Sequence, residues 1–299
     1  MPLLHRRRTS RQRRRRGRAT ARREKTPIVI VGVGRAGGAL ALGLERAGWK
    51  VSIFPRSAGS VRRAVALGLR VADQVSVETA AVCILAVPDV AVGEVAASLL
   101  ADLGASTALV HCAGALPLEA LGGDGLGGRA RGSFHPLVAI SSPEDALAGH
   151  AVALSATSKP LLAVLRKMAA DLGLRPIEVP EDRRAAYHAG AVLCAGAVVA
   201  LASAAVEALG EAGISEKDAV AALLPLMRSA LHGIEQRGLR GGLTGPVVRG
   251  DVEVIRAHLA ALPADVAPLY RALSLRSLAL AGDRLPPDVR ARIEELLRG

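Results

Sequence analysis

Two short apolar runs, Ile28 to Val31 and Val51 to Phe54, follow the basic start of the chain. Between them lies a helical pattern rich in leucine and alanine, which Gly48 ends. A strand, a helix and a second strand are therefore predicted. This is the order of elements in a dinucleotide-binding unit.

Strand and helix patterns go on alternating to about residue 180. Further strands are predicted at residues 69–72, 81–87, 107–112, 130–134, 151–155 and 176–179, with helices at about 61–65, 90–103 and 160–172. The run Ala81 to Val87 is apolar without alternation, as in a strand buried on both faces. Short connections between alternating strands and helices predict an α/β fold with a doubly wound parallel sheet.

Beyond Pro180 only helical patterns remain. Helices are predicted at residues 182–212, from a capping box at Ser215 to Asp218, and at 251–262, 265–281 and 287–297, with a break at Thr244-Gly245-Pro246. We therefore expect a disordered basic tail over residues 1–25, a Rossmann NAD(P)-binding domain over 26–180 and an all-helical substrate and dimerisation domain over 181–299.

Residues 189–206 contain no charged side chain, which raises the question of a transmembrane helix. Their content is mostly alanine and glycine, and His188 lies at the edge. We therefore expect a helix buried in a domain core or a dimer interface, and no membrane contact.

The turn after the first strand carries the motif GxGxxG. Gly32 would allow the tight turn, Gly34 the approach of a pyrophosphate, and Gly37 the close packing of the helix on the strand. Arg35 and Ala36 begin that helix, whose free N–H groups suit a phosphate. A glycine-rich loop selected only for packing is the alternative, but the flanking strands and helix favour cofactor binding.

The second strand indicates which cofactor binds. Arg56 and Ser57 stand where an NAD site usually offers an acid to the ribose, and Arg62 and Arg63 follow. A cation and small donors suit the 2′-phosphate of NADP better than NAD. The alternative is that Arg56 is a solvated loop charge.

Ligands of doubly wound sheets bind outside the carboxyl ends of the strands. The residues expected at that edge are Gly32, Arg56, Val87, Pro88, Asp89, His111, Gly114 and His135. Of these, Val87, Pro88, Asp89 and Gly114 are predicted to add contacts to the cofactor.

The net charge of +12 belongs almost entirely to the tail. Residues 1–25 hold 12 basic residues and one acid, whereas the rest holds 27 basic and 26 acidic residues. Nucleic-acid binding is therefore expected, if at all, through the tail; a targeting segment and an upstream extension are alternatives. The three cysteines form no CxxC pair, which indicates a reducing cytoplasm and no metal site.

Several spaced motifs carry a family resemblance. They are GVGRAGGAL, AVPD, GSFHPL at 132–137, AAYHAGAV at 185–192, LTGPVVRGD at 243–251 and LYRAL at 269–273. Over roughly residues 26–280 the chain resembles two-domain proteins that join a Rossmann-like domain to the domain of unknown function 2520. These are similar to pyrroline-5-carboxylate reductase and 6-phosphogluconate-type dehydrogenases, which implies a helical domain that closes the cofactor cleft and usually forms a dimer. Gly196 departs from the asparagine expected there.

Hydride transfer to a carbonyl or imine needs a proton donor from the protein. His188 is the first candidate, with Tyr187 beside it, and His135 is the second. A helix-packing role for Tyr187 and His188 is the alternative. Thr244 and Arg249 are candidates for substrate binding, although Asp251 as an N-cap with a solvated Arg249 explains the same residues.

Two functions follow from these residues. The first is a cytoplasmic, homodimeric NADP(H)-dependent oxidoreductase acting on a small carbonyl, imine or 2-hydroxy acid. The second is a non-catalytic NADP(H)-binding sensor or scaffold protein.

Overall fold

The computed structural model describes residues 26–299. The predictions for the basic tail, including nucleic-acid binding through it, concern residues outside that range. Within the described chain, one compact unit ends at His188 and a second begins at Ala189. The helix turn that carries Tyr187 and His188 therefore belongs with the sheet.

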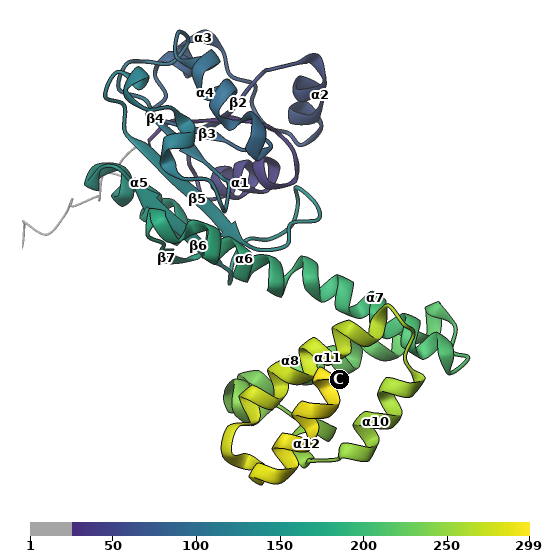
Figure 1. The fold of residues 1–299 in the computed structure, drawn as a ribbon. Coiled ribbons are helices and arrows are strands. Elements are labelled where there is room, and N and C mark those ends of the chain that lie inside the picture. The colour runs from purple at the N-terminus through teal and green to yellow at the C-terminus, as the bar shows by residue number, and fades with distance from the viewer. Residues whose placement is uncertain (1–25) are drawn as a thin grey trace, which may run out of the picture. The chain divides into compact units, whose positions relative to one another are not determined.

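The first unit is built on a seven-stranded sheet in the order β2-β1-β3-β4-β5-β6-β7 (Figure 1). The strands are β1 Ile28–Val31, β2 Val51–Phe54, β3 Val82–Leu85, β4 Ala108–His111, β5 Arg131–Leu137, β6 Ala151–Ala156 and β7 Arg175–Glu178. All neighbouring pairs are parallel except β5 and β6. The predicted doubly wound sheet is therefore parallel except at this pair, where residues 138–150 contain no crossover helix, which a parallel connection needs.

Helices cover both faces of the sheet, as a doubly wound fold requires. They are α1 Arg35–Arg46, α2 Ala58–Ala66, α3 Gln74–Glu78, α4 Val92–Leu99 and α5 Lys159–Asp171. Leu40 of α1 and Leu165 of α5 share one buried cluster with Ile30 and Ile84. Val95 of α4 packs in a second cluster, with Leu85. Successive strand residues thus enter opposite cores, which explains why these strands are apolar throughout.

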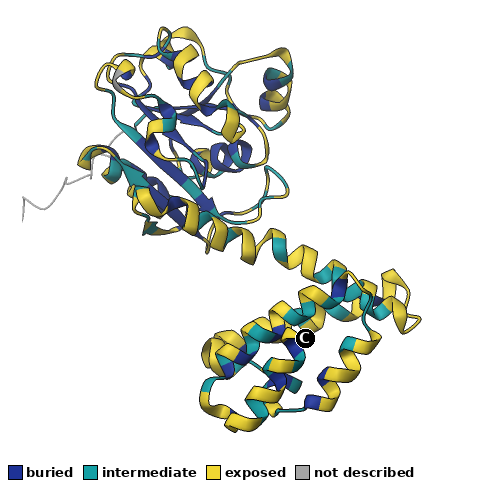
Figure 2. Ribbon diagram, viewed as in Figure 1, coloured by how far each residue is buried: buried dark blue, intermediate teal, exposed yellow. Residues whose placement is uncertain are grey.

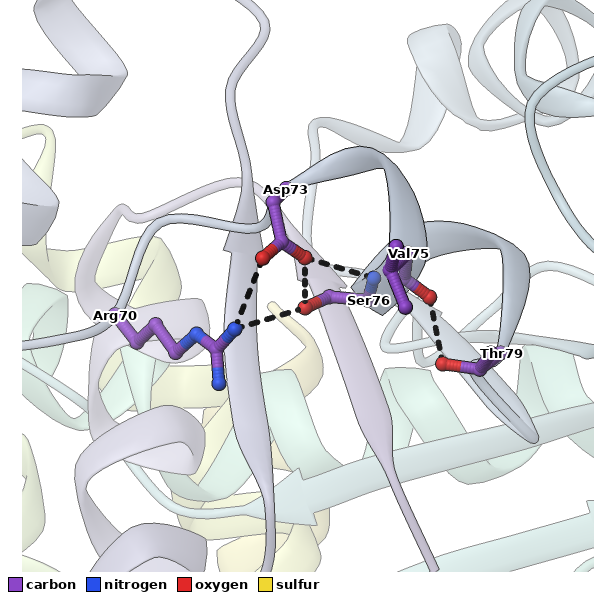
Figure 3. Close-up of polar contacts among 5 residues, drawn as sticks. All are labelled: Arg70, Asp73, Val75, Ser76 and Thr79. Atoms are coloured by element: carbon purple, nitrogen blue, oxygen red, sulfur yellow. Dashed lines mark hydrogen bonds and ion pairs between the residues drawn. The ribbon is translucent and has the colours of Figure 1, made fainter.

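The strand predicted at residues 69–72 is reduced to a single bridge between Val71 and Ile53. Asp73 ends it by capping α3: its carboxylate accepts the backbone N–H of Ser76 at 2.8 Å and the guanidinium of Arg70 at 3.1 Å (Figure 3). The chain therefore leaves the sheet at Asp73, because helix capping satisfies the next backbone donor.

The second unit is entirely helical. The helices are α6 Arg184–Cys194, which spans the boundary between the units, α7 Gly196–Glu211, α8 Glu216–Gly242, α9 Pro246–Arg249, α10 Val252–Ala261, α11 Val266–Ala281 and α12 Pro287–Arg298. The single helix predicted over residues 182–212 is broken at Ala195, next to Gly196, a poor helix former. The predicted cap of α8 is present, with the Ser215 hydroxyl accepting the Asp218 N–H at 3.3 Å. Ile255, Leu278 and Ile293 belong to the hydrophobic core of the second unit.

The apolar stretch around α7 is exposed in the single chain (Figure 2). The expectation that this helix is buried in a domain core is therefore wrong. By length and composition, the helical stretch 181–211 would suffice to cross a membrane. Large exposed side chains include Leu193 and Val199 here and Leu226 and Leu231 on α8. An extensive apolar surface therefore remains exposed on the second unit.

Candidate functional site

The glycines after β1 differ in what surrounds them. Gly32 has a φ of +99°, and a Cβ there would lie 2.3 Å from the carbonyl oxygen of Ala86. A Cβ on Gly37 would lie 2.0 Å from the oxygen of Gly32. In contrast, no atom lies within 4 Å of the place that a Cβ on Gly34 would take. Gly32 and Gly37 are thus required by the fold, whereas Gly34 leaves open space at the backbone.

The open space at Gly34 adjoins the N-terminus of α1. Gly34 occupies the N-cap position, no side chain caps the helix, and its first turn contains no acid. The first N–H groups of the helix, from Arg35 and Ala36 onward, are left for an anion. These residues fit the pyrophosphate of a dinucleotide, which the N-termini of such helices bind.

The parallel register aligns the carboxyl ends of β2, β1, β3 and β4 at one edge of the sheet, and β5 continues past that edge from Ser133 to Leu137. Val31 of β1 stands beside Phe54 and Leu85, His111 beside Leu85, and Ser133 beside His111. The segments that follow these strands begin at the same edge, as predicted. They carry Val87, Pro88, Asp89 and Gly114.

Arg56 and Ser57 lie between β2 and α2. The hydroxyl of Ser57 accepts the Ser60 N–H at 3.2 Å, and the Ser57 N–H donates to Ser60 Oγ at 3.0 Å, which forms a capping box. Arg56 is exposed and makes no ion pair with any described residue. Ser57 therefore fixes the start of α2, and Arg56 is available to an anionic ligand.

His135 and Tyr187 meet although 52 residues separate them. His135 Nδ1 and the Tyr187 hydroxyl share a hydrogen bond of 2.7 Å, and the His188 ring stands edge to face with His135 at 5.7 Å. A Cβ on Gly114 would lie 2.3 Å from His188 Nδ1 and 3.0 Å from His135 Nε2. Both imidazole rings thus pack against the backbone of Gly114, the residue predicted as a cofactor contact.

Burial sets the protonation of this cluster. Together with the charges of His188 and Arg184, it lowers the pKa of His135 to about 4. Burial also raises the pKa of Tyr187, which Arg184 partly offsets. At neutral pH a neutral imidazole therefore faces a protonated phenol, an arrangement that can deliver a proton.

Arg184 is a residue of this region that sequence reasoning missed. Its side chain is 1% exposed and ion-pairs with Glu181 at 3.6 Å. The available signal was helical spacing, since Arg184 precedes Tyr187 and His188 by three and four residues and shares their helix face.

His111 is placed at the edge by its strand but is completely buried. Burial lowers its pKa to about 4, helped by the charge of Arg184 and opposed by the backbone groups of Ala113 and Pro117. Burial also raises the pKa of Cys112 to about 12, which keeps its thiol protonated and unreactive. Neither side chain is therefore a candidate for proton transfer or nucleophilic attack.

The two predicted substrate-binding residues belong to the second unit. Thr244 precedes α9, and Arg249 ends it. Arg249 Nε donates to the carboxylate of Asp251 at 2.7 Å, and Asp251 stands at the N-cap of α10 without making a side-chain cap. The guanidinium of Arg249 is thus paired with Asp251, although its side chain is 62% exposed. Over residues 26–299, no cluster of three potential metal ligands occurs.

Comparisons with known proteins agree with this layout. A family profile for the NAD binding domain of 6-phosphogluconate dehydrogenase matches residues 27–120, and one for the domain of unknown function 2520 matches residues 150–277. No protein of curated function matches the sequence closely.

Solved structures resemble the chain over most of its length. A candidate NADP oxidoreductase from Bacteroides fragilis is 25% identical, with a TM-score of 0.68 over 86% of this chain and 98% of that one. A Thermotoga maritima protein is also 25% identical, with a TM-score of 0.68 over 85% and 98%. The imine reductase of Myxococcus stipitatus, solved with NADP+, shares the fold at 16% identity, with a TM-score of 0.60 over 89% and 99%.

The family predicted from the motifs is confirmed by the two profiles in order along the chain. The Rossmann sheet followed by a helical unit is also confirmed. The chain belongs to the two-domain proteins that join an NAD-binding Rossmann domain to the domain of unknown function 2520, and it has the fold of NAD(P)-binding oxidoreductases.

Proposed function

We propose that the protein is an NADP(H)-dependent oxidoreductase acting on a small carbonyl, imine or 2-hydroxy acid. The observation that carries the proposal is that two features share one sheet edge. One is the open backbone at Gly34, and the other is the cluster of His135, Tyr187 and His188 over Gly114. Cofactor binding and proton transfer need these two features together.

The bound cofactor would supply or accept a hydride at the substrate carbon. The protein would supply a proton. In reduction, Tyr187 or His188 would donate this proton to the substrate oxygen or nitrogen. His135, neutral at pH 7 and hydrogen-bonded to the Tyr187 hydroxyl, would orient that donor. A donor of this kind contributes about 100-fold or more to the rate.

The preference for NADP(H) over NAD(H) rests on Arg56. It lies with Ser57 at the start of α2, whose first turn carries no acid. We expect NADPH to raise the melting temperature more than NADH does, because only NADPH brings a 2′-phosphate to this cation. The variant Arg56→Asp should reverse that order. Differential scanning fluorimetry with each cofactor measures both effects.

The matched control is Arg46→Asp, the same charge change at the last turn of α1. It should leave the order of NADPH and NADH as in the wild type. Equal stabilisation of the wild type by both cofactors would rule out the NADP assignment.

We also propose a homodimer in the cytoplasm. Val199 and Leu226 are 72% and 64% exposed, and an apolar groove of about 750 Å³ lies among α7, α10 and α11. A second copy would cover these surfaces, which a soluble monomer rarely exposes. The three cysteines are unpaired, as is usual in a reducing compartment.

Light scattering on the purified protein should give twice the chain mass of 30.7 kDa, and Val199→Glu should lower it toward the monomer by placing a charge in the apolar contact. Arg228→Glu on α8 is a control for added negative charge on an already polar position. A monomeric wild type would contradict the dimer.

A further inference from the structure

Arg184, the first residue of α6, is buried among three segments of the sheet. One amino group donates to Ser155 Oγ at 2.9 Å, and the other donates to the carbonyl of Ala113 at 2.9 Å and to Ser133 Oγ at 2.6 Å. Its carboxylate partner Glu181 also accepts the N–H of Leu118 at 2.9 Å. A single guanidinium thus connects β5, β6 and the segment after β4.

Each of these three acceptors is connected, through the chain or through the sheet, to the cluster of His135, Tyr187 and His188. Ser133 precedes His135 by two residues on β5. Ser155 on β6 is the register partner of Ser133. Ala113 precedes Gly114, the residue on which both imidazoles rest. Any displacement of Arg184 would therefore be transmitted directly to His135 and Gly114.

The helix itself carries the other half of the cluster. Tyr187 and His188 follow Arg184 by three and four residues, so all three lie on one face of α6. By anchoring the first turn of α6 to the strand ends, Arg184 sets where the Tyr187 hydroxyl meets His135. The planar, forked guanidinium suits this role because it can hold several acceptors in fixed directions.

Charge is the second consequence of its burial. The titratable or charged groups that face His135 are Tyr187, His188 and Arg184, and His111 lies behind it on β4. Arg184 is the permanent cation of this set, and the carboxylate of Glu181, 3.6 Å away, offsets only part of its field at this buried position. A proton on the His135 ring is disfavoured beside it.

We propose that Arg184 is a positioning residue, which fixes Tyr187 and His188 against His135 and whose buried positive charge adds to the effect of burial in disfavouring a proton on the His135 ring. Its part in turnover rests on the proposed function. The effect of Arg184 on the protonation of His135 is independent of that function, because the protonation of a histidine can be measured without a substrate.

The first experiment follows the ring signals of His135 by NMR as the pH is lowered. The chain has seven histidines, and His135→Asn identifies the signal. In the wild type the midpoint should lie well below 6.5. In Arg184→Met it should rise by about half a pH unit or more, because a cation is removed while burial remains. Arg184→Gln provides a second neutral variant if the methionine variant does not fold.

The matched control is Arg183→Met, since Arg183 is adjacent in sequence but its side chain is 74% exposed, paired with the equally exposed Asp182. Its His135 midpoint should equal that of the wild type. An unchanged midpoint in a folded, neutral Arg184 variant would overturn the electrostatic part of the proposal.

Arg184→Lys separates charge from position. The ammonium keeps the charge, so the His135 midpoint should stay close to that of the wild type, but it cannot hold Ser133, Ser155 and Ala113 in the same geometry. We expect kcat to fall about tenfold or more with an unchanged KM for NADPH. Wild-type kcat in this variant would overturn the positioning role. Absence of turnover in the wild type would instead count against the proposed function and leave the NMR result to decide the charge effect.

Discussion

Gly34→Asp is expected to lower the affinity for NADPH by about 100-fold or more while the protein remains folded. The carboxylate would occupy the open space beside the N-terminus of α1 and repel the pyrophosphate there. The helix itself should tolerate the change, because Gly34 is its N-cap and aspartate is a favourable N-cap residue. Fluorescence titration with NADPH measures the affinity, and circular dichroism follows the fold.

Gly37→Ala is the comparison that separates cofactor binding from folding. Its methyl group would lie 2.0 Å from the oxygen of Gly32, so α1 must move away from β1. We expect a loss of about 2 kcal/mol or more in the free energy of unfolding. A Gly34→Asp protein that binds NADPH like the wild type would show that the pyrophosphate does not lie at this turn.

Tyr187→Phe is expected to reduce kcat by about 100-fold or more without changing the dissociation constant for NADPH. The substitution removes the hydroxyl that is bonded to His135 and keeps the ring that packs beside it. The substitution should therefore slow the proton-transfer step and leave cofactor binding unchanged. Stopped-flow or steady-state oxidation of NADPH, run over a panel of carbonyls and imines, measures it.

The chain offers a matched control in its other tyrosine. Tyr270 also shares a hydrogen bond with a histidine, His258 Nδ1, at 2.9 Å, but within the second unit. Tyr270→Phe makes the same chemical change in the second unit, outside the cluster of His135, Tyr187 and His188, and should retain most of the activity. Equal losses in the two variants would refute a specific role for Tyr187.

Local sequence patterns were sufficient for most of the elements. β1 and β2 lie where the apolar runs predict them, and α11 and α12 each differ from their predicted bounds by one residue at one end. Such elements depend on periodicity and on nearby caps and breakers. The direction of β6 was not predictable in this way, because it depends on the absence of a crossover helix before it rather than on the residues of the strand.

The site was predictable only in part for the same reason. The glycine turn is local, and its residues alone predict what Gly32, Gly34 and Gly37 do. Arg184 has no local signature of burial: its partners Ala113 and Ser133 are 71 and 51 residues away, and only the folded sheet brings them together. A charged residue near a helix start is ordinarily solvated, so its burial had to be seen in the structure.

The most direct test is a structure of the protein with NADP+ bound. We expect the pyrophosphate at Gly34, the 2′-phosphate beside Arg56, and the nicotinamide C4 facing Tyr187 and His188 with room for one small substrate, the reacting atoms about 3.5 Å apart. A nicotinamide ring turned away from Tyr187, His188 and His135 would contradict this expectation, and would favour a protein that binds the cofactor without using it for chemistry.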